Sequence, residues 1–213
     1  MTATLDHFFI LTEPGAPQAS SLLALGLLEG TPNTHPGQGT ANRRFFFADA
    51  MLELLYLRDA SEALHGPGAR LRLEERYSSK NASPFGIVLR GSPGGADRPF
   101  AAWSYRPDYW DPGQPFLIGD NSNLLEEPLC IVLPGNAPLE RGQTRSGDPF
   151  RHVSEIRLSV PVTKVSPVLQ ALARLDRISL VPGAPHGIEV IFGRGEAGQS
   201  ADLRPELPLL LRW

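Results

Sequence analysis

The chain has 213 residues, of which 41% are hydrophobic, so it can form one large domain or two small halves that share a core. Its 20 basic and 23 acidic residues are interspersed and leave a net charge of −3, which argues against a surface for nucleic acid or anionic membranes. No apolar run approaches the roughly 20 residues that cross a bilayer, and no signal peptide is evident, so we expect a cytoplasmic protein.

The first 57 residues predict a strand, a helix and two further strands. Apolar runs predict strands over residues 5–12 and 51–57, and five leucines predict a helix over residues 16–28. A polar loop follows over residues 30–41. Residues 43–48 pair with 51–57 as a hairpin, with Asp49 and Ala50 as the turn.

Residues 58–135 form a less regular middle portion, followed by a linker over residues 136–150 that is rich in glycine, proline and polar residues. The middle predicts a helix over residues 70–79 and short strands over 85–91, 99–105, 115–119 and 129–134. The single cysteine, Cys130, lies in the last of these strands. It is either a small apolar strand residue or a catalytic thiol.

Residues 151–213 repeat the element order of the first segment. A strand over residues 152–162 precedes a helix over 166–175, which Ser166 caps and Pro167 begins. Strands follow over residues 178–181, 187–193 and 207–213. The repeated strand–helix–strand order and the abundance of turns indicate an α+β fold.

His7 and Glu53 are the most informative candidates for a site, because each lies inside an apolar strand. A buried carboxylate is costly unless a metal or a cation pairs with it. An imidazole and a carboxylate on two strands would supply half of a mixed nitrogen and oxygen metal site. Alternatively, His7 and Glu53 pair with each other, or Arg43 or Arg44 neutralises Glu53.

Two further groups are candidates for substrate binding. The loop that contains His35, Asn42 and Arg43 has the glycines and the polar donors to approach a ligand, or it is a structural turn. Trp103 and Tyr105 belong to an aromatic cluster that either lines an apolar cavity or packs in the core.

Several motifs resemble those of the glyoxalase-like domain family of the vicinal oxygen chelate superfamily. They are Leu5-Asp6-His7, the loop from His35 to Arg43, Leu52-Glu53-Leu54-Leu55, the run Pro115-Phe116-Leu117-Ile118 and the segment from Asp202 to Leu209. The resemblance implies repeated βαβββ modules that form a curved mixed sheet around a cavity. In metal-dependent members, the first and last strands of each module supply one ligand each.

By position, His7 and Glu53 match the ligands of the first module. Glu155 matches the first ligand of a second module at the C-terminus, where Pro208 takes the other ligand position and Glu189 is the alternative fourth ligand. If residues 85–90 instead begin the second module, its ligand position holds no His, Glu or Gln.

The resemblance implies two functions. One is a lyase, isomerase or dioxygenase that uses Zn, Ni, Mn or Fe to act on a small oxygenated molecule. The other is a metal-free protein that binds or sequesters a small ligand in the same cavity. Exposed strand edges make a homodimer plausible.

Overall fold

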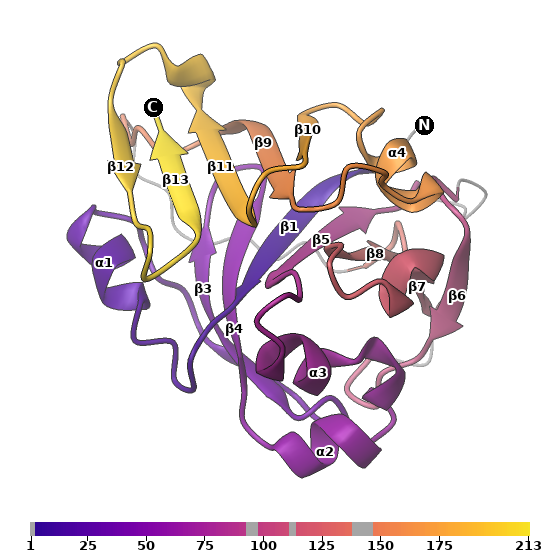
Figure 1. The fold of residues 1–213 in the computed structure, drawn as a ribbon. Helices are drawn as coiled ribbons and strands as arrows, with labels where there is room; N and C mark the ends of the chain where they lie inside the picture. Colours follow the sequence, from indigo (N-terminus) through magenta and orange to yellow (C-terminus); the bar gives the residue numbers. More distant parts are fainter. Residues whose placement is uncertain (1–2, 93–97, 111–113, 138–146) are drawn as a thin grey trace.

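The computed structural model describes residues 3–92, 98–110, 114–137 and 147–213. It has a mixed α+β fold with two sheets, and Figure 1 shows the first sheet curling around the centre of the molecule. No helix within these ranges is long and apolar enough to span a bilayer.

The larger sheet, sheet A, has eight strands in the order β2-β3-β4-β1-β5-β8-β7-β6. Its strands are β1 (Thr4–Leu11), β2 (Asn33–His35), β3 (Thr40–Phe46), β4 (Met51–Leu57), β5 (Phe85–Arg90), β6 (Ala102–Tyr105), β7 (Phe116–Gly119) and β8 (Leu129–Leu133). β1 and β5 pair antiparallel at the centre, and each pairs parallel with the last strand of its own half, β4 or β8. The sheet therefore consists of two similar halves related across the β1–β5 pair.

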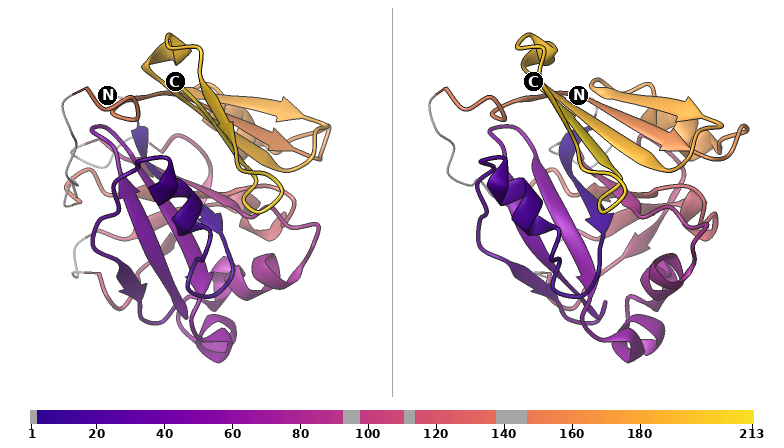
Figure 2. Two further views of the ribbon diagram at one scale, coloured as in Figure 1. Left: turned by 90° about the vertical axis from the view of Figure 1, so that its left-hand side faces the viewer. Right: turned by 60° about the vertical axis from the view of Figure 1, so that its left-hand side comes forward.

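The smaller sheet, sheet B, has five strands in the order β10-β9-β11-β13-β12. Its strands are β9 (Val153–Val160), β10 (Ile178–Pro182), β11 (Gly187–Phe192), β12 (Ser200–Asp202) and β13 (Leu209–Arg212). The order of the pairs differs from that in either half of sheet A. The second half of the curled sheet thus comes from β5 to β8, and the C-terminal segment forms a separate layer (Figure 2).

The helices are short. They are α1 (Ala19–Ala24), α2 (Ala60–His65), α3 (Leu73–Ser78) and α4 (Pro167–Leu172), with 3-10 turns η1 (Ala69–Leu71), η2 (Asp120–Asn123) and η3 (Gly193–Gly195). The expected helix over residues 16–28 is shorter because Ala16 and Gly26 have positive φ. The helix over residues 70–79 divides into η1 and α3 at Arg72, which is left-handed.

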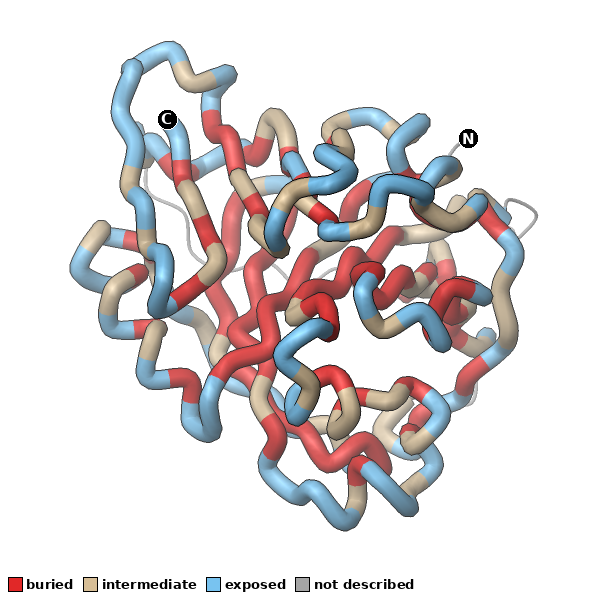
Figure 3. The backbone as a smooth tube through the Cα atoms, in the orientation of Figure 1, coloured by how far each residue is buried: buried red, intermediate tan, exposed pale blue. Residues whose placement is uncertain are grey.

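The main core lies between one face of sheet A and the inner face of sheet B. Alternate residues of β1 and β4, such as Phe8 and Leu52, pack there with Ile156 of β9, Val190 of β11 and Leu169 of α4. Figure 3 shows this buried centre beneath exposed loops. One cluster joins both sheets, and residues 138–146 of the predicted linker lie outside the described residues, so the division of the chain at residues 136–150 stays a prediction.

Glu127 joins the loop before β8 to the start of α4 through hydrogen bonds. This carboxylate is 2% exposed, and it accepts bonds from the backbone N–H and the hydroxyl of Ser166, both at 2.6 Å, and from Asn121 at 3.0 Å. Ser166 in turn caps α4 by accepting from Leu169 N–H. Glu127 therefore holds the first turn of α4 against the loop before β8.

We expect Glu127→Ala to lower the free energy of unfolding by about 3 kcal/mol, because three donors lose a buried charged acceptor. Urea denaturation measures this change. Glu126→Ala is the matched control, since Glu126 is the exposed neighbour; it should change stability by no more than about 0.5 kcal/mol. Equal effects of the two substitutions would contradict this account of Glu127.

Candidate functional site

A cavity of about 490 Å³ lies on the face of sheet A opposite the main core. Its wall on the β5–β8 half is mostly apolar, with Val88, Phe116, Ile118, Leu129 and Ile131. The wall on the β1–β4 half carries most of the polar groups, which include Asp6, His7, Gln38, Arg44 and Glu53. The cavity is therefore apolar on one side and polar on the other.

A β-bulge in β1 produces the polar side. The pairing with β5 passes from Leu5 opposite Leu89 to His7 opposite Val88, which leaves Asp6 as an extra residue. Leu5 and Phe8 both pack in the main core, whereas Asp6 and His7 between them both line the cavity. The bulge thus brings onto one face two neighbouring side chains that a regular strand would send to opposite faces.

Asp6 connects His7 to Arg90 of β5. One carboxylate oxygen of Asp6 lies 2.7 Å from His7 Nδ1, and the other accepts from Arg90 Nε at 2.8 Å and Nη2 at 2.5 Å. Burial alone would raise the pKa of Asp6, but His7 and Arg90 hold it below its usual value. Asp6 is therefore a carboxylate that receives the Nδ1 proton of His7.

Glu53 reaches the same end of the cavity from β4. Asn42 of β3, which is fully buried, donates to Glu53 Oε1 at 2.9 Å. The other oxygen, Oε2, lies 4.0 Å from His7 Nε2. Both residues line the cavity, and each has one side-chain atom held by a neighbour.

His7 holds its proton more tightly than a free histidine. Burial would lower its pKa, but the charge of Glu53 and the hydrogen bond and charge of Asp6 raise it above 6.5. His7 therefore keeps its proton to a higher pH than a free histidine does, with a carboxylate near each ring nitrogen.

Only some of the predicted substrate-binding residues line the cavity. His35 and Tyr105 line the cavity, and Asn42 supports Glu53 behind it. Arg43 instead forms a bidentate pair with Glu29, both bonds at 2.6 Å. Trp103 donates to Ser122 and lies under Arg70, with 3.9 Å between the guanidinium carbon and the ring centroid; neither Arg43 nor Trp103 lines the cavity.

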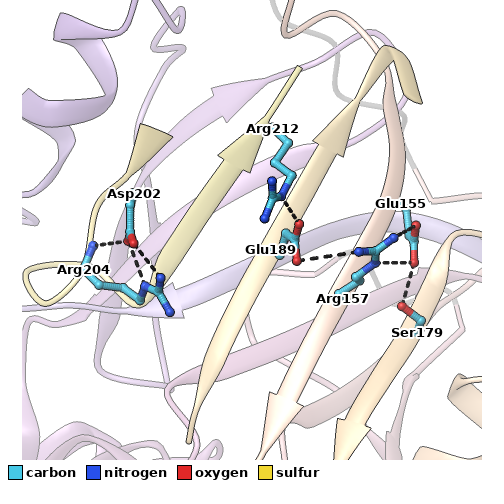
Figure 4. Close-up of polar contacts among 7 residues, drawn as sticks. All are labelled: Glu155, Arg157, Ser179, Glu189, Asp202, Arg204 and Arg212. Atoms are coloured by element: carbon cyan, nitrogen blue, oxygen red, sulfur yellow. Dashed lines mark hydrogen bonds and ion pairs between the residues drawn. The ribbon is translucent and has the colours of Figure 1, made fainter. Parts of the chain in front are cut away.

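Glu155 and Glu189 lie on sheet B (Figure 4), and neither of them lines the cavity. Glu155 accepts from Arg157 at 2.9 and 3.0 Å and from Ser179 at 2.8 Å. Glu189 pairs with Arg212 and lies 3.9 Å from Arg157. The structure therefore does not bring the four predicted metal ligands together.

The cavity offers a poor donor set for a four-ligand metal centre. Opposite His7 and Glu53, the β5–β8 half presents Val88, Ile131 and the cation Arg90. No group of three or more His, Cys, Asp or Glu suited to a metal occurs within the described ranges. Cys130 is buried on the core side, and burial raises the pKa of its thiol to about 12, which fits a small apolar strand residue.

Sequence reasoning missed Asp6, Arg90 and Gln38 as parts of the site, whereas Tyr109 belongs to the aromatic cluster that was a candidate lining of a cavity. Gln38 donates to the Tyr109 hydroxyl at 2.8 Å, and the Tyr109 ring lies 5.3 Å from that of His35. Burial raises the pKa of Tyr109, so it remains a neutral phenol. The motif Leu5-Asp6-His7 offered the one local signal, since it places a carboxylate next to the candidate histidine.

Comparisons with known proteins concern the fold. No family model matches the chain, and no curated protein matches its sequence. A hypothetical protein from Staphylococcus aureus aligns over 99% of both chains, with 11% identity and a TM-score of 0.57. This likeness shows a shared fold along the whole chain.

Two smaller structures align with part of the chain. A methylmalonyl-CoA epimerase from Streptomyces coelicolor covers 64% of this chain and 100% of its own, at 14% identity and a TM-score of 0.44. A hypothetical protein from Bacillus halodurans covers 68% of this chain and 100% of its own, at 14% identity and a TM-score of 0.42. These values are too low to carry an argument about function.

We expect Asp6→Asn to lower the pKa of His7, because the substitution removes a carboxylate that favours the imidazolium. Nuclear magnetic resonance titration of the ring protons measures this pKa. A raised histidine pKa stabilises the fold below the unfolded value of about 6.5, and this contribution is lost as the pH rises through the folded value. Asp6→Asn should therefore cost more stability at about pH 6 than at about pH 9.

Asp202→Asn is the matched control, since Asp202 lies on sheet B and pairs with Arg204. It should leave the titration of His7 unchanged. An unaltered pKa of His7 in Asp6→Asn would show that Asp6 does not hold the imidazolium.

Proposed function

We propose that the chain binds a small, largely apolar organic molecule in the cavity of sheet A. The observation that carries this proposal is the cavity itself, whose volume of about 490 Å³ falls within the range of small-molecule sites. Apolar walls with a few convergent polar groups are typical of such sites.

The distribution of the lining residues supports one orientation of the ligand. Its apolar body lies against β5, β7 and β8, where Val88, Ile118 and Ile131 would gain from the exclusion of water. Its polar group lies at His7 and Glu53, since burial away from these partners would cost free energy.

The architecture supports membership of the vicinal oxygen chelate superfamily. The resemblance implies a curved sheet of paired modules around a cavity, and the eight-stranded sheet has this arrangement. The fold hosts many chemistries, so the function rests on the site. The cytoplasmic location, the lack of nucleic-acid partners and the homodimer stay predictions.

A divalent-metal-dependent lyase, isomerase or dioxygenase is the second candidate. The position of His7 Nε2 beside Glu53 Oε2 favours it, since these are the two first-module ligands that the resemblance implies. The donor set does not fit a four-ligand centre, however, because the other half of the sheet supplies Val88 and Ile131 in place of ligands. Metal-free binding is therefore the better-supported function.

We expect the neutral dye N-phenyl-1-naphthylamine to bind with a stoichiometry of about one per chain, because an apolar body with a single N–H group matches the two sides of the cavity. Fluorescence titration measures the binding. Ile131→Trp should weaken it at least about tenfold by filling the cavity. Leu133→Trp is a second filling variant on the same strand.

Leu124→Trp is the control for added surface tryptophan, since Leu124 is 46% exposed and does not line the cavity. It should bind the dye as the wild type does. Dye binding that survives both filling variants, in proteins that melt as cooperatively as the wild type, would overturn the proposed cavity function.

Metal analysis tests the second candidate. We expect purified protein to retain well below one Zn, Ni, Mn or Fe ion per chain after dialysis, because two protein ligands bind a divalent ion weakly. Plasma mass spectrometry measures the content. If the wild type retains one ion per chain and both His7→Ala and Glu53→Ala lose it, the metal-dependent candidate is established instead.

A further inference from the structure

Tyr105 carries a buried hydroxyl that has no hydrogen-bond partner among the described residues. The residue is 6% exposed at the end of β6, where it pairs with Phe116 of β7, and it lines the cavity of sheet A. Buried polar groups are nearly always hydrogen-bonded, because an unpaired one costs free energy. The hydroxyl is therefore a candidate for a bond that forms only when the cavity holds a ligand.

The side chains packed around Tyr105 are apolar. Its ring meets that of Phe116 edge-on, with 6.5 Å between the centroids, and both residues belong to the same buried cluster as Leu71 and Leu73. Hydrocarbon neighbours cannot accept a hydrogen bond, so this wall does not satisfy the phenol proton. An acceptor for the proton has to come from the contents of the cavity.

Gln38 is a polar neighbour of Tyr105, but its amide nitrogen does not supply the acceptor. This atom, Nε2, donates to the Tyr109 hydroxyl at 2.8 Å. An amide nitrogen only donates, so a closer approach of Nε2 to Tyr105 would still leave the phenol proton unpaired. Burial raises the pKa of Tyr105 more than Gln38 lowers it, and the phenol therefore keeps its proton.

We infer that the ligand carries a neutral carbonyl oxygen, which accepts a hydrogen bond from the Tyr105 hydroxyl. This inference rests on the proposed binding function and names the class of ligand, a ketone, aldehyde or ester. It adds a polar contact on the half of sheet A that does not carry Glu53. A carbonyl oxygen accepts without carrying a proton, so it satisfies Tyr105 and brings no donor that would need a partner of its own.

Other acceptors fit this wall less well. A ligand hydroxyl would bring a second proton among hydrocarbon side chains, where it has nothing to bond with. A carboxylate would bring a charge, and its desolvation beside Phe116 and Leu73 costs more than one hydrogen bond returns. The carbonyl meets the one requirement of Tyr105 at the lowest cost of burial.

Three naphthalenes test the inference by competition against N-phenyl-1-naphthylamine on the full-length protein. 2-Acetylnaphthalene carries the carbonyl, 2-isopropenylnaphthalene has the same shape with a CH₂ group in place of the oxygen, and 2-naphthoate carries a charged acceptor. We expect the wild type to bind the ketone about tenfold more tightly than the other two, because the ketone alone pairs with the hydroxyl without burying a charge. Tighter binding of 2-naphthoate than of the ketone would overturn the carbonyl assignment.

Tyr105→Phe is the decisive variant and has two readouts. It should bind 2-acetylnaphthalene and 2-isopropenylnaphthalene equally, since the donor is gone. It should also melt at or above the wild-type temperature, because the hydroxyl that it removes has no partner in the free protein.

Two further tyrosines supply the controls. Tyr109→Phe loses the bond from Gln38 and should melt below the wild type. Tyr77→Phe is the matched surface control, since Tyr77 is 38% exposed on α3 and does not line the cavity. It should keep both the wild-type preference for the ketone and the wild-type melting temperature.

The outcomes separate this inference from the proposed function. If N-phenyl-1-naphthylamine binds in the cavity but the ketone and the alkene compete equally, the carbonyl contact is wrong and the binding function stands. The same conclusion follows if Tyr105→Phe keeps the preference for the ketone. It follows also if Tyr105→Phe melts clearly below the wild type, since the hydroxyl then has a partner in the free protein. If the dye does not bind in the cavity, the proposed function and the inference both fail.

Discussion

The antiparallel pair of β1 and β5 is the constraint on which the site depends. These central strands are covered on one face by sheet B and bounded on the other by the cavity, so consecutive residues alternate between two interiors. A regular β1 would have sent Asp6 and His7 to opposite faces. The bulge at Asp6 breaks the alternation once, and the carboxylate that would otherwise be separated from His7 becomes its partner.

The charges at the polar end are arranged so that none is buried alone. Asp6 lies between His7 and Arg90, and Asn42 supports Glu53. Such pairing is required because the desolvation of an isolated charge would cost several kcal/mol. Glu53 Oε2 and His7 Nε2 remain 4.0 Å apart, which is too far for a direct hydrogen bond between them. A polar group of a ligand can therefore bind at these two atoms.

The strands that carry His7 and Glu53 could be predicted because they are apolar on both faces. Residues 51, 52, 54 and 55 are all buried around Glu53, which indicates that Glu53 is buried as well. Glu155 and Glu189 lie in strands that alternate, with Ile156 and Val190 buried next to them, and alternation sends the intervening carboxylates toward solvent. This difference in pattern distinguishes a carboxylate of the cavity from one that pairs with surface arginines.

The second half of sheet A was harder to predict, because the order strand, helix, strand recurs elsewhere in the chain. The C-terminal segment has this order, with α4 after β9, but it pairs into a different sheet. Between β5 and β8 the described residues contain no α-helix, so the order is lost although the pairing is kept. The pairing of distant strands depends on packing that a local pattern does not record, and neither the bulge at Asp6 nor the contact with Arg90 has a local signature.

The unequal halves of sheet A determine what the cavity can recognise. Two equivalent halves would place polar groups on both sides, and a bound ion could satisfy them together. Here β4 presents Glu53 while the equivalent strand β8 presents Leu129, Ile131 and Leu133. Among the described lining residues, the carboxylates lie on the β1–β4 half, whereas the polar groups of the other half are Arg90 and the tyrosine hydroxyls. The carboxylates that a ligand can meet therefore lie on the half of the cavity that carries His7 and Glu53.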